Sequence, residues 1–178
     1  MKGTIVASRY AKSLLDLSLE QNSLDKINND MVQLSEICAE SKDLRNLLNN
    51  PTIHDSKKVE VLNALFGNQM EDLSLAFMAL ITKNSRENIL PAIAESFTQL
   101  YKAHNNILDV ILISAQPLEE NAKAKIINKI KSTFDGTIEL IEEIDPSLIG
   151  GFIVKIGDKQ LDSSVASQLT NLKNILLN

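Results

Sequence analysis

Residues 93–115 read IAESFTQLYKAHNNILDVILISA, and the spacing of the apolar residues changes within this stretch. Up to residue 104 they recur every three or four positions, which is the period of an amphipathic helix. From residue 107 they form a nearly unbroken run of isoleucine, leucine and valine, typical of a strand covered on at least one face. The change predicts a boundary near residue 105, with helices before it and a sheet after it.

The helical spacing repeats throughout residues 1–104, interrupted by short polar segments. We predict six helices with short loops and no strand, packed as a compact bundle because none is long enough to be stable alone. Pro51 and Gly67 end the third and fourth helices, and Pro91 fits only the first turn of the sixth. The expected core positions are Val6, Tyr10, Leu14 and Leu17 in the first helix, Leu24, Ile27, Met31, Leu34 and Cys38 in the second, Val59, Leu62, Leu65 and Phe66 in the fourth, and Met70, Leu73, Phe77 and Leu80 in the fifth.

Residues 105–178 predict a small mixed module with the order β-α-β-β-β-α. Strands are expected at 107–115, 137–144, 152–156 and 159–161, with a helix at 118–134 between the first two. Gly157-Asp158 has the composition of a two-residue hairpin turn. Ser164 is expected to cap a final helix, and the apolar stripe of that helix is Val165, Leu169, Leu172 and Leu176. The predicted fold class is α + α/β, with domains at 1–104 and 105–178.

Charge and composition exclude several classes of partner. The net charge is −5, with 11 basic and 13 acidic residues in 1–104 and 7 and 10 in 105–178. Neither part has the basic excess that binding to phosphates requires, so we expect no nucleic-acid partner and no direct lipid-binding patch. The single cysteine, Cys38, cannot form an internal disulfide, which favours a reducing compartment. No signal peptide or membrane span is expected, so any membrane association is through a partner.

The sequence offers little for catalysis, and we expect no catalytic, cofactor or metal site. His54 and His104 have no cysteine or carboxylate at a metal-ligand spacing. Gly150-Gly151 followed by Lys155 lacks the outer glycine and the Lys-Ser/Thr end of a phosphate loop. These two glycines are expected to let the backbone turn tightly into the third strand.

The remaining functional candidates are surfaces on the first and fifth helices, whose apolar sets are wider than one stripe. Such a helix either occupies the centre of its bundle or is covered by another molecule. The residues alone favour the central position over a groove that receives a partner helix.

Residues 144–158, IDPSLIGGFIVKIGD, followed by Asp162 and Ser164-Val165, resemble the C-terminal signature of the delta subunit of F-type ATP synthases. The mitochondrial relative of that subunit is the oligomycin-sensitivity-conferring protein. Arg9-Tyr10-Ala11 resembles the first-helix motif of the family, and Asn84-Ser85-Arg86 resembles the motif before its sixth helix. The signature residues, expected to be structural, are Asp145, Gly150, Gly151, Gly157, Asp158, Asp162 and Ser164. Ser85 and Ser163 replace glycines usual in the family, and residues 166–168 lack its basic residues.

The resemblance implies a non-catalytic peripheral-stalk subunit of a proton-translocating ATP synthase, present in one copy per complex. Residues 1–104 would hold the N-terminal helix of an alpha subunit between the first and fifth helices, and residues 105–178 would bind the C-terminal end of the b subunit. The subunit would be peripheral on the cytoplasmic side of the cell membrane. The implied groove residues are Tyr10, Ala11, Leu14, Ala76 and Leu80.

Two alternatives remain at this stage. One is an unrelated helical adaptor or scaffold, which a different co-purifying partner would reveal. The other is an enzyme whose site has no recognisable motif, which would show activity that depends on His54 or Lys155.

Overall fold

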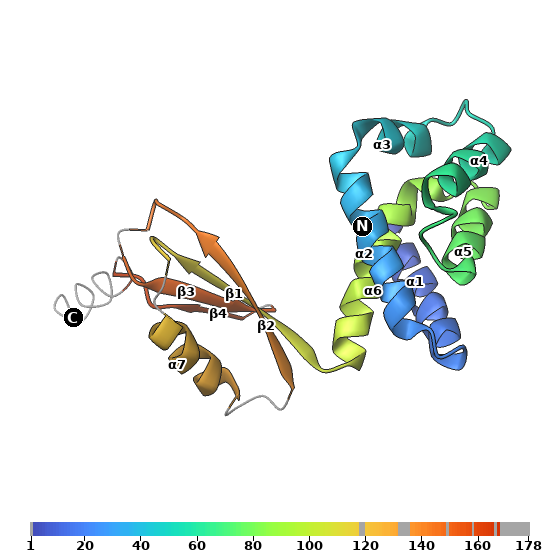
Figure 1. Cartoon of the computed structure of the whole chain (residues 1–178). Coiled ribbons are helices and arrows are strands. Elements are labelled where there is room, and N and C mark those ends of the chain that lie inside the picture. The colour runs from blue at the N-terminus through green and yellow to red at the C-terminus, as the bar shows by residue number, and fades with distance from the viewer. Residues whose placement is uncertain are drawn as a thin grey trace. The chain divides into compact units, whose positions relative to one another are not determined.

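The computed structural model describes residues 2–117, 120–131, 136–148, 150–157, 159–165 and 167. The chain divides into two compact units, Met1–Lys102 and Ala103–Asn178, shown in Figure 1. Helices precede a four-stranded mixed sheet, so the predicted α + α/β class is confirmed.

The first unit is built from helices connected by short turns. Two of these turns are closed by Asn22 and Ser85, which have left-handed backbones with φ of 52° and 55°. In both turns the next amide donates to a carbonyl five residues earlier, the Schellman pattern that satisfies the end of a helix. The helices are α1 (Lys2–Glu20), α2 (Leu24–Glu40), α3 (Lys42–Asn49), α4 (Asp55–Phe66), α5 (Asp72–Lys83) and α6 (Leu90–His104), with a 3-10 segment, η1 (Glu87–Ile89), before α6.

The core of this unit contains most of the predicted positions, including Ile27, Met31, Leu34 and Cys38 of α2, with Leu24 partly buried against them. The prediction of a core position is wrong for three residues: Leu17, Leu65 and Leu80 have exposed fractions of 43%, 47% and 53%. The stripe of α1 is also rotated from the predicted one, because its small residues rather than Val6 and Tyr10 are fully buried. Small side chains let the α1 backbone lie close to its neighbours, an arrangement that hydrophobicity alone does not reveal. The buried residues of α1 are Ala7, Ala11, Leu14, Leu15 and Ser18.

The second unit is a sheet with the strand order β2-β1-β3-β4. β1 pairs in parallel with β2 and antiparallel with β3, and β3 pairs antiparallel with β4. Because β1 and β2 are parallel, a crossover is required between them, and α7 supplies it. Ile126 and Ile130 of α7 pack on the face of the sheet that holds Val110, Leu112 and Val154. The bounds are β1 (Ile107–Ser114), α7 (Glu120–Lys131), β2 (Thr137–Ile144), β3 (Phe152–Ile156) and β4 (Lys159–Asp162).

Several predictions in this unit fall on residues outside the described ranges. They are the turn residue Asp158, the ends of the predicted 118–134 helix, and Leu169, Leu172 and Leu176 of the predicted final helix. Val165 is helical, and the Ser167 amide donates to the Ser164 hydroxyl at 3.3 Å, as expected for a helix that begins there.

Candidate interaction surfaces

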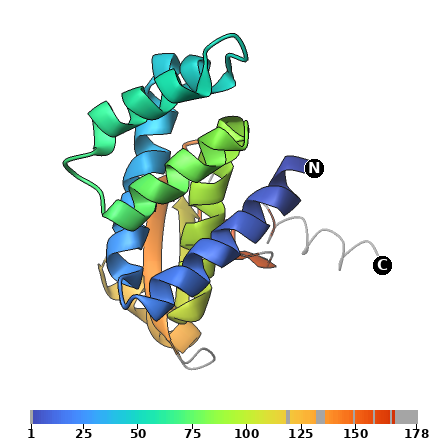
Figure 2. The same cartoon turned by 90° about the vertical axis from the view of Figure 1, so that its right-hand side faces the viewer.

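The helices α1 and α5 lie side by side (Figure 2). They contact each other through two aromatic rings. Tyr10 on α1 and Phe77 on α5 have ring centroids 6.4 Å apart and an interplanar angle of 74°. This edge-to-face arrangement is one of the favourable geometries for an aromatic pair. Phe77 is nearly buried, whereas Tyr10 is half-buried and reaches the surface.

The predicted groove residues divide into a buried and an exposed set. Ala11 and Leu14 are fully buried, so they belong to the core beneath α1 and are not on the surface. Ala76 and Leu80 are exposed on α5, and they lie one residue before and three residues after Phe77. We call Tyr10, Ala76, Phe77 and Leu80 the α1–α5 face.

The N-terminal end of α5 is fixed by a buried carboxylate of α2. Asp30 is 6% exposed, and its Oδ2 accepts hydrogen bonds from the Ser74 hydroxyl at 2.5 Å and the Glu71 amide at 3.0 Å. The negative charge also lies at the positive end of the helix dipole. Lys26 and Glu71 add an exposed ion pair of 2.8 Å at the same end, which raises the pKa of Lys26.

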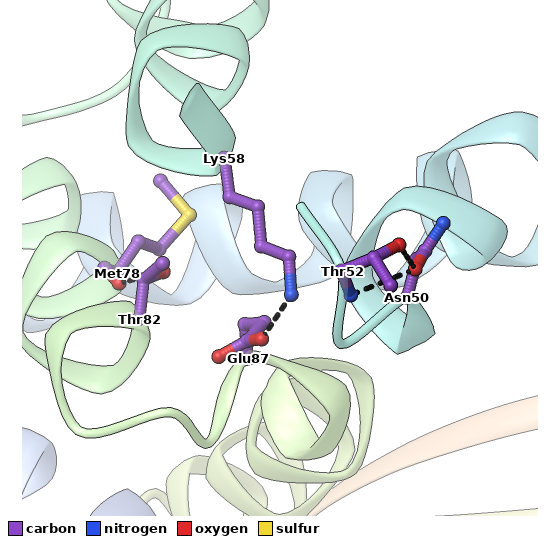
Figure 3. Close-up of polar contacts among 6 residues, drawn as sticks. All are labelled: Asn50, Thr52, Lys58, Met78, Thr82 and Glu87. Carbon is purple, nitrogen blue, oxygen red and sulfur yellow. Dashed lines mark hydrogen bonds and ion pairs between the residues drawn. The ribbon is translucent and has the colours of Figure 1, made fainter. Parts of the chain in front are cut away.

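The C-terminal end of α5 is fixed through the loop that leads to α6. Lys58 of α4 forms a buried ion pair with Glu87 at the start of η1 (Figure 3). Arg86, the preceding residue, donates from Nη1 to the Tyr10 hydroxyl at 2.9 Å, and its guanidinium carbon lies 5.7 Å from the centroid of the Tyr10 ring. The loop therefore contacts α4 on one side and α1 on the other.

Sequence reasoning missed Asp30, Lys58 and Glu87. The sequence does indicate that Lys58 is buried, because it lies four residues before Leu62 and eight before Phe66 on the buried stripe of α4. A charged residue on such a stripe requires a buried partner of opposite charge. The position of that partner, 29 residues further along the chain, is not encoded in any local pattern.

Four signature residues meet where β3 begins and β4 ends. The Gly150 carbonyl accepts from the Val165 amide at 3.0 Å. Gly151 has a φ of +82°, and a Cβ there would lie 2.4 Å from the Ser163 carbonyl oxygen, so only glycine fits. Asp162 accepts from the Ser164 amide at 2.8 Å and from the Ser167 hydroxyl at 2.7 Å, and these bonds hold the pKa of its carboxyl below the ordinary value.

Two further signature residues act in separate turns. Asp145 follows β2, where its amide donates to the Ser114 carbonyl at 2.9 Å and its carboxylate accepts from the Ser147 amide at 2.9 Å. The bond from Ser147 lowers the pKa of the Asp145 carboxyl. Gly157 has a φ of +54° in the turn after β3. Signature residues with described surroundings thus form turns and caps.

An apolar cavity of about 520 Å³ lies between α7 and the sheet. Its walls include Ile126, Ile130, Phe152 and Leu161, with Lys129 and Lys159 among the lining residues. Beside the α7–sheet packing, Lys123 pairs with Glu120 at 2.9 Å and with Glu142 at 2.8 Å, which raises the pKa of Lys123.

The residues considered for chemistry belong to different elements. His54 precedes α4 as its N-cap residue, whereas His104 ends α6. Within the described ranges, no group of three histidine, cysteine or acidic residues has the spacing to hold a metal ion. Cys38 is buried in the helical core, and burial raises the pKa of its thiol. None of the described helices is both long enough and apolar enough to cross a bilayer.

Comparison with known proteins adds an independent assignment. The family model for the ATP synthase delta (OSCP) subunit matches residues 6–176. ATP synthase subunit delta of Cytophaga hutchinsonii is 36% identical over 174 residues, which cover 98% of this chain and 95% of the relative. The corresponding protein of Christiangramia forsetii is 33% identical over 176 residues, covering 99% and 95%. A chain of the Toxoplasma gondii mitochondrial ATP synthase hexamer has the same fold, with a TM-score of 0.75 at 23% identity over 97% of both chains.

A helical unit followed by a mixed α/β unit defines a two-unit protein of the α + α/β class. Within that class, this chain belongs to the ATP synthase delta (OSCP) family. It is a structural, non-catalytic component of the peripheral stalk of an F-type ATP synthase, the membrane-associated complex of proton transport and ATP synthesis. The alternative of an unrelated adaptor is not supported.

Proposed function

We propose that this subunit connects two parts of its complex, one through each unit. The helices α1 to α6 act as one bundle that holds the N-terminal helix of an alpha subunit, and the sheet unit holds the C-terminal end of the b subunit. One copy serves each complex, on the cytoplasmic side of the cell membrane. This function requires affinity and mechanical resistance instead of a reaction centre.

The observation that carries the proposal is the α1–α5 face. Leu80 is 53% exposed in the isolated chain and Ala76 is exposed beside it, while the half-buried Tyr10 packs on Phe77 and supplies aromatic surface between the two helices. An amphipathic partner helix binds by burying apolar side chains of this kind, exposed next to an aromatic pair. Both ends of α5 are held by buried charged groups, so this surface is formed before the partner arrives.

Support for the second contact comes from the sheet unit. Its described core is small: the buried apolar residues are Val110, Leu112, Ile113 and Val154. The cavity beside α7 and the half-exposed Ile144 and Leu161 leave further apolar atoms available for burial. We propose that the end of the b subunit buries part of this surface.

The proposal is tested by titrating the full chain with a synthetic peptide of the alpha-subunit N-terminus and with a C-terminal fragment of the b subunit. Isothermal titration calorimetry is expected to show one site for each ligand and an unchanged affinity for one when the other is saturating, because the two sites lie on different units. Absence of binding by both ligands, or competition between them, would contradict the proposal.

A further inference from the structure

The loop between α5 and α6 has a feature that stability alone does not explain. Lys58 is 1% exposed and is among the largest fully buried side chains, and its partner Glu87 is 7% exposed. The second carboxylate oxygen of Glu87, Oε2, finds no hydrogen-bond donor in the described part of the chain. Removing two charges from water is costly, and an apolar pair of similar volume is often as stable or more stable. We therefore expect the Lys58–Glu87 pair to act by fixing the position of the loop more than by stabilising the fold.

The position that the pair fixes is that of Arg86. The Arg86 amide donates to the Ile81 carbonyl at 3.1 Å, which holds its backbone to the end of α5, and the next residue is Glu87. Arg86 thus lies between the helix end and the buried ion pair. Its backbone has little freedom on either side, although its side chain is at the surface.

The side chain of Arg86 connects the loop to the α1–α5 face. Its guanidinium donates to the Tyr10 hydroxyl and also lies within cation–π distance of the same ring. At an exposed site these contacts are weak when a long, flexible side chain must be ordered to make them. A fixed backbone at Arg86 lowers that entropic cost, so the contacts hold the Tyr10 ring against Phe77.

We propose that Lys58, Glu87 and Arg86 are positioning residues for partner binding: the buried Lys58–Glu87 pair fixes the loop, and Arg86 holds Tyr10 in the orientation that the partner helix contacts. This inference rests on the proposed function, because Tyr10 belongs to the α1–α5 face. It adds residues that lie outside that face and act through Tyr10.

The test compares full-length variants by calorimetry with the alpha-subunit peptide. In the Lys58→Met/Glu87→Gln variant both charges are absent, and we expect a denaturation midpoint close to wild type but about three- to tenfold weaker peptide binding. Arg86→Met is expected to weaken binding by a similar factor, and the combination of all three substitutions is expected to weaken it no further. As a matched control, Lys123→Met/Glu142→Gln removes an ion pair in the sheet unit and should leave the affinity unchanged.

A second readout needs no partner. The chain contains two tyrosines, Tyr10 and Tyr101, so the ring resonances of Tyr10 are readily assigned by NMR. The Arg86→Met and Lys58→Met/Glu87→Gln variants are both expected to shift them in the ligand-free protein. If the charge-pair variant does not fold, Arg86→Met decides alone. Wild-type affinity together with unshifted Tyr10 resonances in a folded variant would overturn the inference, whereas a wild-type chain that binds no peptide would instead contradict the proposed function.

Discussion

The two units differ in what holds them together. The helical unit has an extensive apolar core, and buried polar groups fix both ends of α5. The sheet unit has a small described core beside an apolar cavity, and its signature residues act mainly through backbone turns. Among the described residues the helical unit has the larger apolar core, and we propose that its α1–α5 face is formed before a partner binds.

The largest expected difference between the units is in their cores. Phe97→Ala should destabilise the helical unit by about 3–5 kcal/mol, whereas Val154→Ala should destabilise the sheet unit by about 2 kcal/mol. Both tyrosines belong to the helical unit. In urea unfolding, only Phe97→Ala is therefore expected to shift the tyrosine fluorescence transition, while circular dichroism reports both. Equal shifts of the tyrosine transition would show that the units unfold together.

The next effect concerns the buried anchor of α5. Asp30→Ala should lower the free energy of unfolding by about 2–3 kcal/mol, because it leaves the buried Ser74 hydroxyl and the Glu71 amide without an acceptor. Asp25 is a suitable control, since its carboxylate accepts a hydrogen bond from Tyr101 at an exposed site. Asp25→Ala should cost less than about 1 kcal/mol. Similar losses in the two variants would mean that Asp30 does not anchor α5.

In the sheet unit, alanine substitutions at two glycines distinguish the stability cost of a steric clash from that of backbone strain alone. Gly151→Ala brings a Cβ within 2.4 Å of the Ser163 carbonyl oxygen at a φ of +82°, so it should destabilise by at least about 2 kcal/mol. At Gly157, where φ is +54°, a Cβ meets no atom within 4 Å. Gly157→Ala should therefore cost only the conformational strain of about 1 kcal/mol. Thermal unfolding monitored by circular dichroism distinguishes them, and the reverse order would refute the close approach at Gly151.

The smallest expected effect is the pH dependence of the exposed Asp162. Hydrogen bonds from Ser167 and Ser164 lower its pKa from the ordinary value of 3.8, so the charged form is favoured in the folded state. Its stabilising contribution is present above that ordinary value and is lost as the pH falls through the lower folded pKa. Asp162→Asn should thus lower the melting temperature slightly at pH 7, and the difference from wild type should shrink towards pH 3. A constant difference across this range would exclude the linkage.

Local patterns predicted the elements because each depends on neighbours in sequence. The bounds of β2 and β3 follow from alternating side chains between turn residues, and Pro91 marks the first turn of α6. Burial on α1 was harder to predict, since Ala11 is inside through close packing that its hydrophobicity does not require. Leu80 looked like a core residue for the same reason that it suits an interface: both environments favour apolar side chains.

The polar contacts that fix α5 and the loop after it could not be predicted from the sequence. Asp30 contacts a residue 44 positions away, and Arg86 contacts one 76 positions away. Such pairs depend on how the helices pack, and the spacing of one helix carries no information about its partner's polar residues. The resemblance to the delta family predicted that Tyr10 and Leu80 belong to one surface, a prediction that only binding measurements test.

Substituting Leu80 with aspartate in the full chain tests the proposed α1–α5 binding face. Because Leu80 is half-exposed, Leu80→Asp should leave the helical fold intact and weaken binding of the alpha-subunit peptide by at least about 30-fold, the loss expected for a central interface residue. Leu65→Asp, at a residue of similar exposure on α4, should bind like wild type. A folded Leu80→Asp protein that binds the peptide with wild-type affinity would show that the α1–α5 face does not hold the alpha subunit.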